Sequence, residues 1–165
     1  WLMGGVIALA LTLTAAETLT GLLADNPLPV LSGAQSRADY LRAELGWHAL
    51  AMEAVNGLPD GAKVLFLWEP RSYYCAGAER CLPDGLLDRW WHARQSQADA
   101  AAIARQWRAE GTTHVLIFEL GREVIERDGT DPFTPEDWAQ LAALRRDEMQ
   151  LVADLGGVYQ LYAWK

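Results

Sequence analysis

The first 24 residues most constrain what this chain can fold into, because they are apolar on every side of a helix. No charged side chain occurs from Trp1 to Ala16, and Glu17 is the first to interrupt the run. A helix without a polar face belongs in lipid or in a deep core. The uncharged stretch is shorter than the roughly 20 residues that cross a bilayer. We therefore expect a membrane helix over residues 1–24 that is either truncated on its N-terminal side or short of a full span.

Two other interpretations of this run remain open. A cleavable signal peptide also has an apolar stretch near its N-terminus, but here no Lys or Arg precedes the run and Trp1 already lies within it. The other alternative is a buried helix of a soluble domain. The sequence favours a piece of a longer, polytopic membrane protein over both.

A linker then leads to a domain outside the bilayer. Residues 25–35 contain Pro27 and Pro29, which end a helix and extend the chain. The length of 165 residues and the hydrophobic content of 51% suit one folded core with an appendage. We therefore predict a soluble α/β domain over residues 36–165.

Two short, nearly continuous apolar runs predict parallel strands in this domain. They are residues 63–68 and 113–118, and runs of this kind are typical of strands that are buried on both faces. The helix predicted between them has its cap at Ser96 and ends at Gly111. This order predicts a β-α-β unit with a right-handed crossover, the basic piece of a small Rossmann-like layered fold.

Further elements are expected on either side of that unit. They are a helix over residues 36–57, a short strand over 86–91, a helix from Thr134, and strands over 151–155 and 158–164. The last two strands are joined by Gly156-Gly157, which predicts a C-terminal β-hairpin. The predicted fold class is therefore α/β, with a parallel core and this hairpin.

The net charge and the two cysteines indicate which partners the chain can bind and in which cellular compartment it folds. The formal net charge of −8 leaves no basic stripe to neutralise phosphates, so nucleic acid is not an expected partner. Cys75 and Cys81 have five residues between them, and a loop of that length brings two sulfurs together. The predicted disulfide implies an oxidising compartment, and the alternative is two free thiols. No metal site is predicted, because the three histidines are scattered.

Polar residues follow both predicted parallel strands. Glu69, Arg71 and Tyr73 follow the first strand, and Glu119 follows the second. Carboxyl ends of parallel strands converge at the edge of the sheet where ligands bind. These four residues are therefore the candidate ligand-binding residues. The alternative is an ion pair that fixes the loop, because carboxylates perform acid–base chemistry only where their environment shifts a pKa.

No catalytic residue and no cofactor are predicted. The chain has no dinucleotide fingerprint, no P-loop, no Gly-x-Ser-x-Gly elbow and no carboxylate–histidine motif on one helix. Eight tryptophans are a high number, and packing in the core is favoured over stacking on sugar rings or a place at a membrane interface. In adjacent Trp90-Trp91, an extended chain points one ring inward and the other outward.

Three segments carry a resemblance to a known family. They are residues 62–74, residues 111–117 with a Gly-x-Thr-His-x-hydrophobic pattern, and the end of the hairpin at 159–162. In this order, after an apolar helix and a proline-containing linker, they resemble the C-terminal end of bacterial polytopic membrane glycosyltransferases of the dolichyl-phosphate-mannose protein mannosyltransferase and aminoarabinose transferase type. The resemblance extends from about Pro29 to the end and rests on short hydrophobic motifs.

The resemblance implies a parent enzyme in the bacterial cell membrane that moves a sugar from a polyprenyl-phosphate donor on the extracytoplasmic face. The family's catalytic acidic residue lies in an early loop that this chain does not contain, so no catalytic residue is carried over. The chain is then a non-catalytic terminal domain whose partners are membrane lipid and a lipid-linked sugar or acceptor glycan. Two other classes remain open: a membrane-anchored ligand-binding or sensor module, and an independent enzyme with a perturbed carboxylate at the strand ends.

Overall fold

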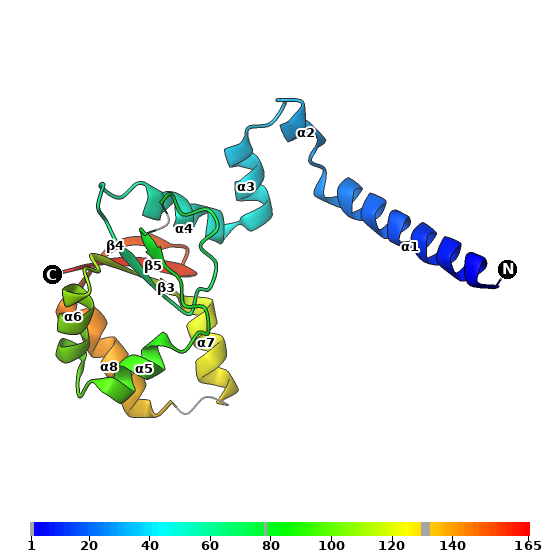
Figure 1. The fold of residues 1–165 in the computed structure, drawn as a ribbon. Helices are drawn as coiled ribbons and strands as arrows, with labels where there is room; N and C mark the ends of the chain where they lie inside the picture. Colours follow the sequence, from blue (N-terminus) through cyan, green and yellow to red (C-terminus); the bar gives the residue numbers. More distant parts are fainter. Residues whose placement is uncertain (1, 78, 130–132) are drawn as a thin grey trace. The chain divides into compact units, whose positions relative to one another are not determined.

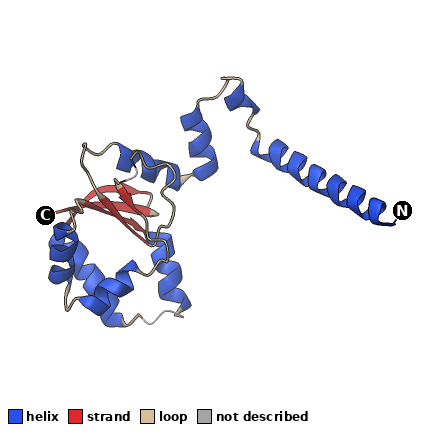
Figure 2. Cartoon of the chain, in the orientation of Figure 1, coloured by secondary structure: helices blue, strands red, loops and turns tan. Residues whose placement is uncertain are grey.

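The computed structural model describes residues 2–77, 79–129 and 133–165. The chain forms two compact units, one ending at Gly46 and the other extending from Trp47 to Lys165. The second unit contains the sheet and most of the helices (Figure 2).

The first unit begins with the long apolar helix α1 (Leu2–Asp25), which confirms the N-terminal apolar helix. Its segment Met3–Ala24 has 22 residues and a mean hydropathy of 1.8, and by length and composition it can cross a membrane. None of that segment is buried. The hydroxyls of Thr12 and Thr18 donate to carbonyl oxygens one turn earlier, both at 2.8 Å, so these polar groups are satisfied within the helix.

The expected single helix over residues 36–57 is wrong, because two helices occupy this stretch. After the short helix α2 (Leu28–Leu31), α3 (Arg37–Leu45) is capped by Ser36, whose side chain accepts the N–H of Asp39. The helix ends at Gly46, where φ is 53°, in the left-handed region that glycine enters without strain. The following helix, α4 (Trp47–Asn56), belongs to the second unit.

The second unit is built on a mixed sheet of five strands in the order β2-β1-β3-β5-β4. The strands are β1 (Val64–Leu67), β2 (Cys81–Leu82), β3 (His114–Phe118), β4 (Met149–Leu155) and β5 (Tyr159–Trp164). Strand β1 pairs in parallel with β2 and β3, whereas β5 pairs antiparallel with β3 and β4. The mixed α/β class, the parallel β1–β3 pair and the C-terminal hairpin are thereby confirmed.

The remaining helices correct several details of the sequence prediction. They are α5 (Arg89–Ser96), α6 (Ala100–Ala109), α7 (Glu119–Asp128), α8 (Pro135–Ala143) and a π-helical turn, η1 (Leu144–Glu148). The strand expected over 86–91 is wrong, since α5 begins there and the additional strand is β2. Asp99, rather than Ser96, caps α6 by accepting the N–H of Ala102 at 2.8 Å. Thr134 caps α8 in a capping box with Asp137, as its position before Pro135 predicts.

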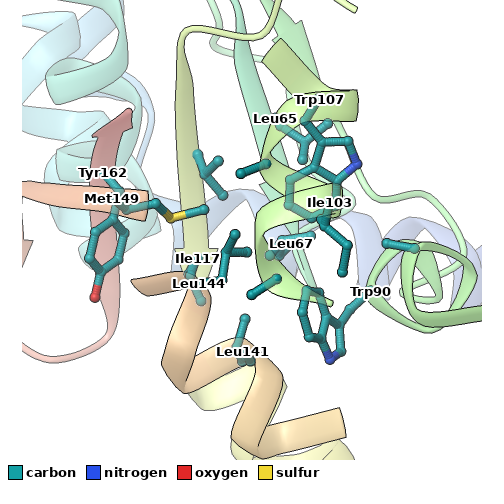
Figure 3. Packing of buried hydrophobic residues seen from close by; sticks show 14 of the residues in the cluster. Leu65, Leu67, Trp90, Ile103, Trp107, Ile117, Leu141, Leu144, Met149 and Tyr162 are labelled. Carbon is teal, nitrogen blue, oxygen red and sulfur yellow. The ribbon is translucent and has the colours of Figure 1, made fainter. Parts of the chain in front are cut away.

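Two hydrophobic clusters cover the two faces of the sheet, because successive strand residues point to opposite sides. On one face, Val64 and Phe66 pack with Met52 and Val55 of α4. On the other face, residues of β1 and β3 pack against α5, α6, α8 and η1, in the cluster shown in Figure 3. Figure 1 accordingly shows α4 on one side of the sheet and α5, α6 and α8 on the other. The sheet is thus the middle layer of three.

Candidate functional site

A strained turn at the carboxyl end of β1 positions the first candidate residue. Trp68 is buried and has φ of 60°, a backbone conformation that a bulky side chain rarely adopts. Asp84 holds this turn, because its Oδ2 accepts the N–H of Trp68 at 2.9 Å and its own N–H donates to the carbonyl of Glu69 at 3.0 Å. The turn directs Glu69 into the protein, where its exposed fraction is 0%.

Glu69 is surrounded by hydrogen-bond donors. Arg71 donates from Nε to Oε1 and from Nη2 to Oε2, both at 2.8 Å, and its backbone N–H donates to Oε1 at the same distance. The hydroxyl of Tyr159 donates to Oε2, and Nδ1 of His48 lies 3.6 Å from that oxygen. Of the four side chains, only that of Arg71 reaches solvent, with 47% exposed. These contacts join α4, the turn after β1 and the start of β5.

This arrangement fixes the ionisation of its members. Burial alone raises the pKa of Glu69, but hydrogen bonds from Arg71, His48 and Tyr159 outweigh it and lower the pKa to about 2. The hydrogen bond to Glu69 raises the pKa of Arg71. Burial, followed by the hydrogen bond to the carboxylate, raises the pKa of Tyr159. Near neutral pH, Glu69 is therefore an ionised acceptor and holds no proton that a general acid needs.

Glu119 does not join this network, although Glu69 and Arg71 do come together. It lies at the start of α7, where Nε of Arg122 donates to Oε2 at 2.7 Å. Nη2 of Arg145 forms an ion pair with Oε1 at 2.8 Å. Phe118, one residue earlier, stacks on Tyr159 with ring centroids 4.8 Å apart, on the face of the sheet that α4 covers. Arg145, the partner of Glu119, lies over the ring of Tyr162, which belongs to the cluster on the opposite face, so Glu119 lies on that face.

Tyr73 is the fourth candidate, and the structure places it at the surface with 88% of its side chain exposed. It lies two residues beyond Arg71, on the loop between β1 and β2. Neither Tyr73 nor Glu119 shares a recorded contact with the Glu69–Arg71 pair in the described part of the chain. The role of these four residues in ligand binding stays a prediction.

Sequence reasoning missed four side chains that build the two carboxylate networks. They are His48, Arg122, Tyr159 and Arg145. Arg122 was within reach of a sequence argument, because it lies one helical turn after Glu119. Tyr159 required the strand register, in which it pairs with Phe118. Arg145 had no usable signal, because η1 breaks the periodicity that places side chains along a helix.

The predicted disulfide between Cys75 and Cys81 is present, with the two Cα atoms 6.3 Å apart. It ties the loop after β1 to the first residue of β2. Asn56 of α4 fixes the same loop, since its side chain donates to the carbonyl of Tyr74 and accepts the N–H of Ala76. The bridge therefore strengthens a contact between α4, the loop and the edge of the sheet.

Reducing this disulfide is expected to lower the free energy of unfolding by about 2 kcal/mol, the lower end for such bridges because the closed loop is short. Urea unfolding with and without reductant measures the difference. The double variant Cys75→Ser with Cys81→Ser is the control, and it should show the lower stability in both conditions. A reductant effect of equal size in that variant would contradict the assignment to this bridge.

No group of three or more His, Cys, Asp or Glu side chains is placed to hold a metal ion among the described residues. Comparison of the chain with protein-family models, with curated proteins and with solved structures found no match.

Proposed function

We propose that this chain is a non-catalytic, extracytoplasmic α/β domain of a membrane glycosyltransferase that uses a polyprenyl-phosphate-linked sugar donor. One observation carries the proposal: an apolar helix with no buried segment precedes a domain that contains a disulfide. The apolar helix favours a membrane. The disulfide favours the oxidising side of that membrane, since cytosolic thiols are kept reduced.

The arrangement of the resemblance segments supports the glycosyltransferase part of the proposal. Residues 62–74 contain β1 and the Glu69–Arg71 pair, residues 111–117 contain most of β3, and residues 159–162 lie in β5. These three strands are adjacent at the centre of the sheet. The parallel β1–β3 pair with α5 and α6 between its strands is consistent with a Rossmann-like arrangement.

The state of the buried carboxylates supports a non-catalytic role. Glu69 and Glu119 each accept from arginine side chains, and the low pKa of Glu69 leaves it without a proton to donate. A domain of this kind acts as a lid, as an acceptor-binding surface or as a folding support for the membrane part. The catalytic acid would belong to another part of the parent enzyme.

A membrane-anchored ligand-binding module is the second candidate, and the exposure of Arg71 favours it. Nε and Nη2 of this guanidinium are held by Glu69, whereas Nη1 makes no recorded hydrogen bond to the described residues. The guanidinium also lies over the ring of Phe118, 5.8 Å from its centroid. A half-exposed arginine fixed by a buried carboxylate is suited to recognising an anionic group.

Expression of the complete reading frame that encodes this chain tests the proposal. We expect several further apolar helices before residue 1, transfer of sugar from a polyprenyl-phosphate donor by the isolated membranes, and activity of alkaline phosphatase fused after Lys165 in intact cells. Membranes from cells with the empty vector are the control. A single apolar helix with an active fusion would favour the binding module, and an inactive fusion would contradict the extracytoplasmic location.

A further inference from the structure

A cleft beside Glu119 has the chemistry of a small binding site. It has a volume of about 190 Å³ and lies between α7 on one side and α8 with η1 on the other. Its lining consists of Arg122, Glu126, Trp138, Leu141, Ala142 and Arg145. We propose that this cleft binds one acidic monosaccharide, a sugar ring that carries a carboxylate, with Arg145 as the partner of the acid group.

Of the two arginines that line the cleft, Arg145 has fewer recorded ion pairs and is the one that can still pair with a ligand. Its one recorded ion pair with the described residues is to Oε1 of Glu119, while Oε2 of that carboxylate accepts from Arg122. Nε and Nη2 of Arg145 are buried and make no hydrogen bond in the described part of the chain, so that Nη2 meets Oε1 of Glu119 as an ion pair alone. No hydrogen bond from Nη1 to the described residues is recorded. Arg122, in contrast, also pairs with Glu123 and Glu126. A ligand carboxylate in the cleft would complete the pairing of Arg145.

The π-helical turn brings Arg145 to the cleft. Here η1 follows α8 directly and places Leu144 in the core while the guanidinium of Arg145 lies over the ring of Tyr162, 6.0 Å from its centroid. Arg146, the next residue, points to solvent and pairs with Asp147. The turn thus places Arg145 at the cleft and Arg146 at the protein surface.

The rest of the lining selects a sugar ring over a simple anion. Trp138, whose ring also packs against Phe133 and Trp68, and Leu141 give the cleft an apolar wall of the kind that sites for small organic ligands have. Glu126, whose Oε2 pairs with Arg122, adds an acceptor for hydroxyl groups, and its negative charge disfavours phosphate, which carries close to two charges, more than it disfavours the single charge of a carboxylate. The volume is below the roughly 300–1,000 Å³ of drug-sized sites, which limits the ligand to about one ring. This inference does not depend on the glycosyltransferase proposal.

Titration calorimetry of the full chain in detergent tests this site with glucuronate, glucose and inorganic phosphate. We expect glucuronate to bind with a dissociation constant of about 1 mM, with glucose and phosphate each at least about tenfold weaker. Arg145→Gln should weaken glucuronate binding at least about tenfold, whereas Arg146→Gln, the neighbouring control, should not change it. Arg145→Lys, which keeps the charge and the Glu119 ion pair, should bind with intermediate affinity.

Four results would overturn the inference. Three are the absence of glucuronate binding by the folded chain, equal affinity for glucose and glucuronate, and equal binding by the Arg145→Gln and Arg146→Gln variants. Tighter binding of phosphate than of glucuronate would also overturn it, because the cleft would then be a plain anion site. Circular dichroism of each variant confirms that the fold is kept, and Trp138→Leu provides a second variant that leaves the ion pairs in place.

Discussion

Replacing Trp90 with Ala is expected to lower the free energy of unfolding by about 3–5 kcal/mol, the loss typical of a large aromatic residue removed from a core. The exposed fraction of Trp90 is 0%, and its ring meets that of Trp107 edge to face, with centroids 6.4 Å apart. The cluster around it includes side chains of β1, α5, α6 and α8 (Figure 3). The substitution leaves a cavity that these rigid elements fill only in part.

Urea unfolding followed by circular dichroism measures this loss. Trp91→Ala is the matched control, since Trp91 lies next in the same helix but is only partly buried, and we expect it to cost less than half as much. Trp90→Phe should cost less than Trp90→Ala, because it keeps a ring, leaves a smaller cavity and removes an Nε1 that is buried without an acceptor among the described residues. Equal losses at Trp90 and Trp91 would show that α5 presents a different face to the core.

Glu69→Gln is expected to cost about 3 kcal/mol at neutral pH and to remove the part of the protein's loss of stability in acid that comes from this carboxylate. The carboxyl has a pKa of about 2 in the folded protein against an ordinary value of 4.5, and that difference corresponds to about 3 kcal/mol. Because the folded pKa is the lower one, this contribution is complete above about pH 4.5. It is lost as the pH falls from there through about 2.

Measuring the free energy of unfolding from pH 7 to pH 2 for both proteins tests this linkage. The difference between them should be largest at neutral pH and should shrink toward zero near pH 2. Asp147→Asn, at an exposed carboxylate paired with Arg146, is the control and should keep the acid profile of the parent. A constant difference between the Glu69→Gln and parent proteins at every pH would mean that the variant acts through packing and not through charge.

The centre of the sheet could be predicted from the sequence, because strands that are buried on both faces consist of consecutive apolar residues. Strands β1 and β3 are continuous apolar runs, and the hairpin is marked by Gly156-Gly157. Helix α7 was missed because polar residues dominate it, and of its apolar residues Leu120, Val124 and Ile125 only Ile125 packs against the core. The break at Gly46 was missed because helical spacing continues across it.

The candidate site could be predicted only where its residues are close together in the sequence. Glu69 and Arg71 are two residues apart, so the turn after β1 suffices to pair them. Because β1 and β3 are parallel, Glu119 was expected to meet Glu69 at the same edge of the sheet. The face of the sheet on which each side chain lies depends on the residue at which its strand ends, and the sequence does not give that residue. Arg145 reaches Glu119 from a distant part of the chain, through a turn whose geometry no periodicity indicates.

Helix α4 has a mechanical consequence, because it begins at Trp47, immediately after the first unit ends. It is also the one helix, in the described chain, that contributes to the cluster on its face of the sheet. Any tension along the chain between a membrane-held α1 and the second unit would therefore enter the second unit through α4. Peeling that helix away would uncover Phe66 and Leu116 and remove His48 from Tyr159 and Glu69. Under such tension the second unit would begin to unfold on the face that α4 covers, while α5, α6 and α8 on the opposite face would bear no direct force.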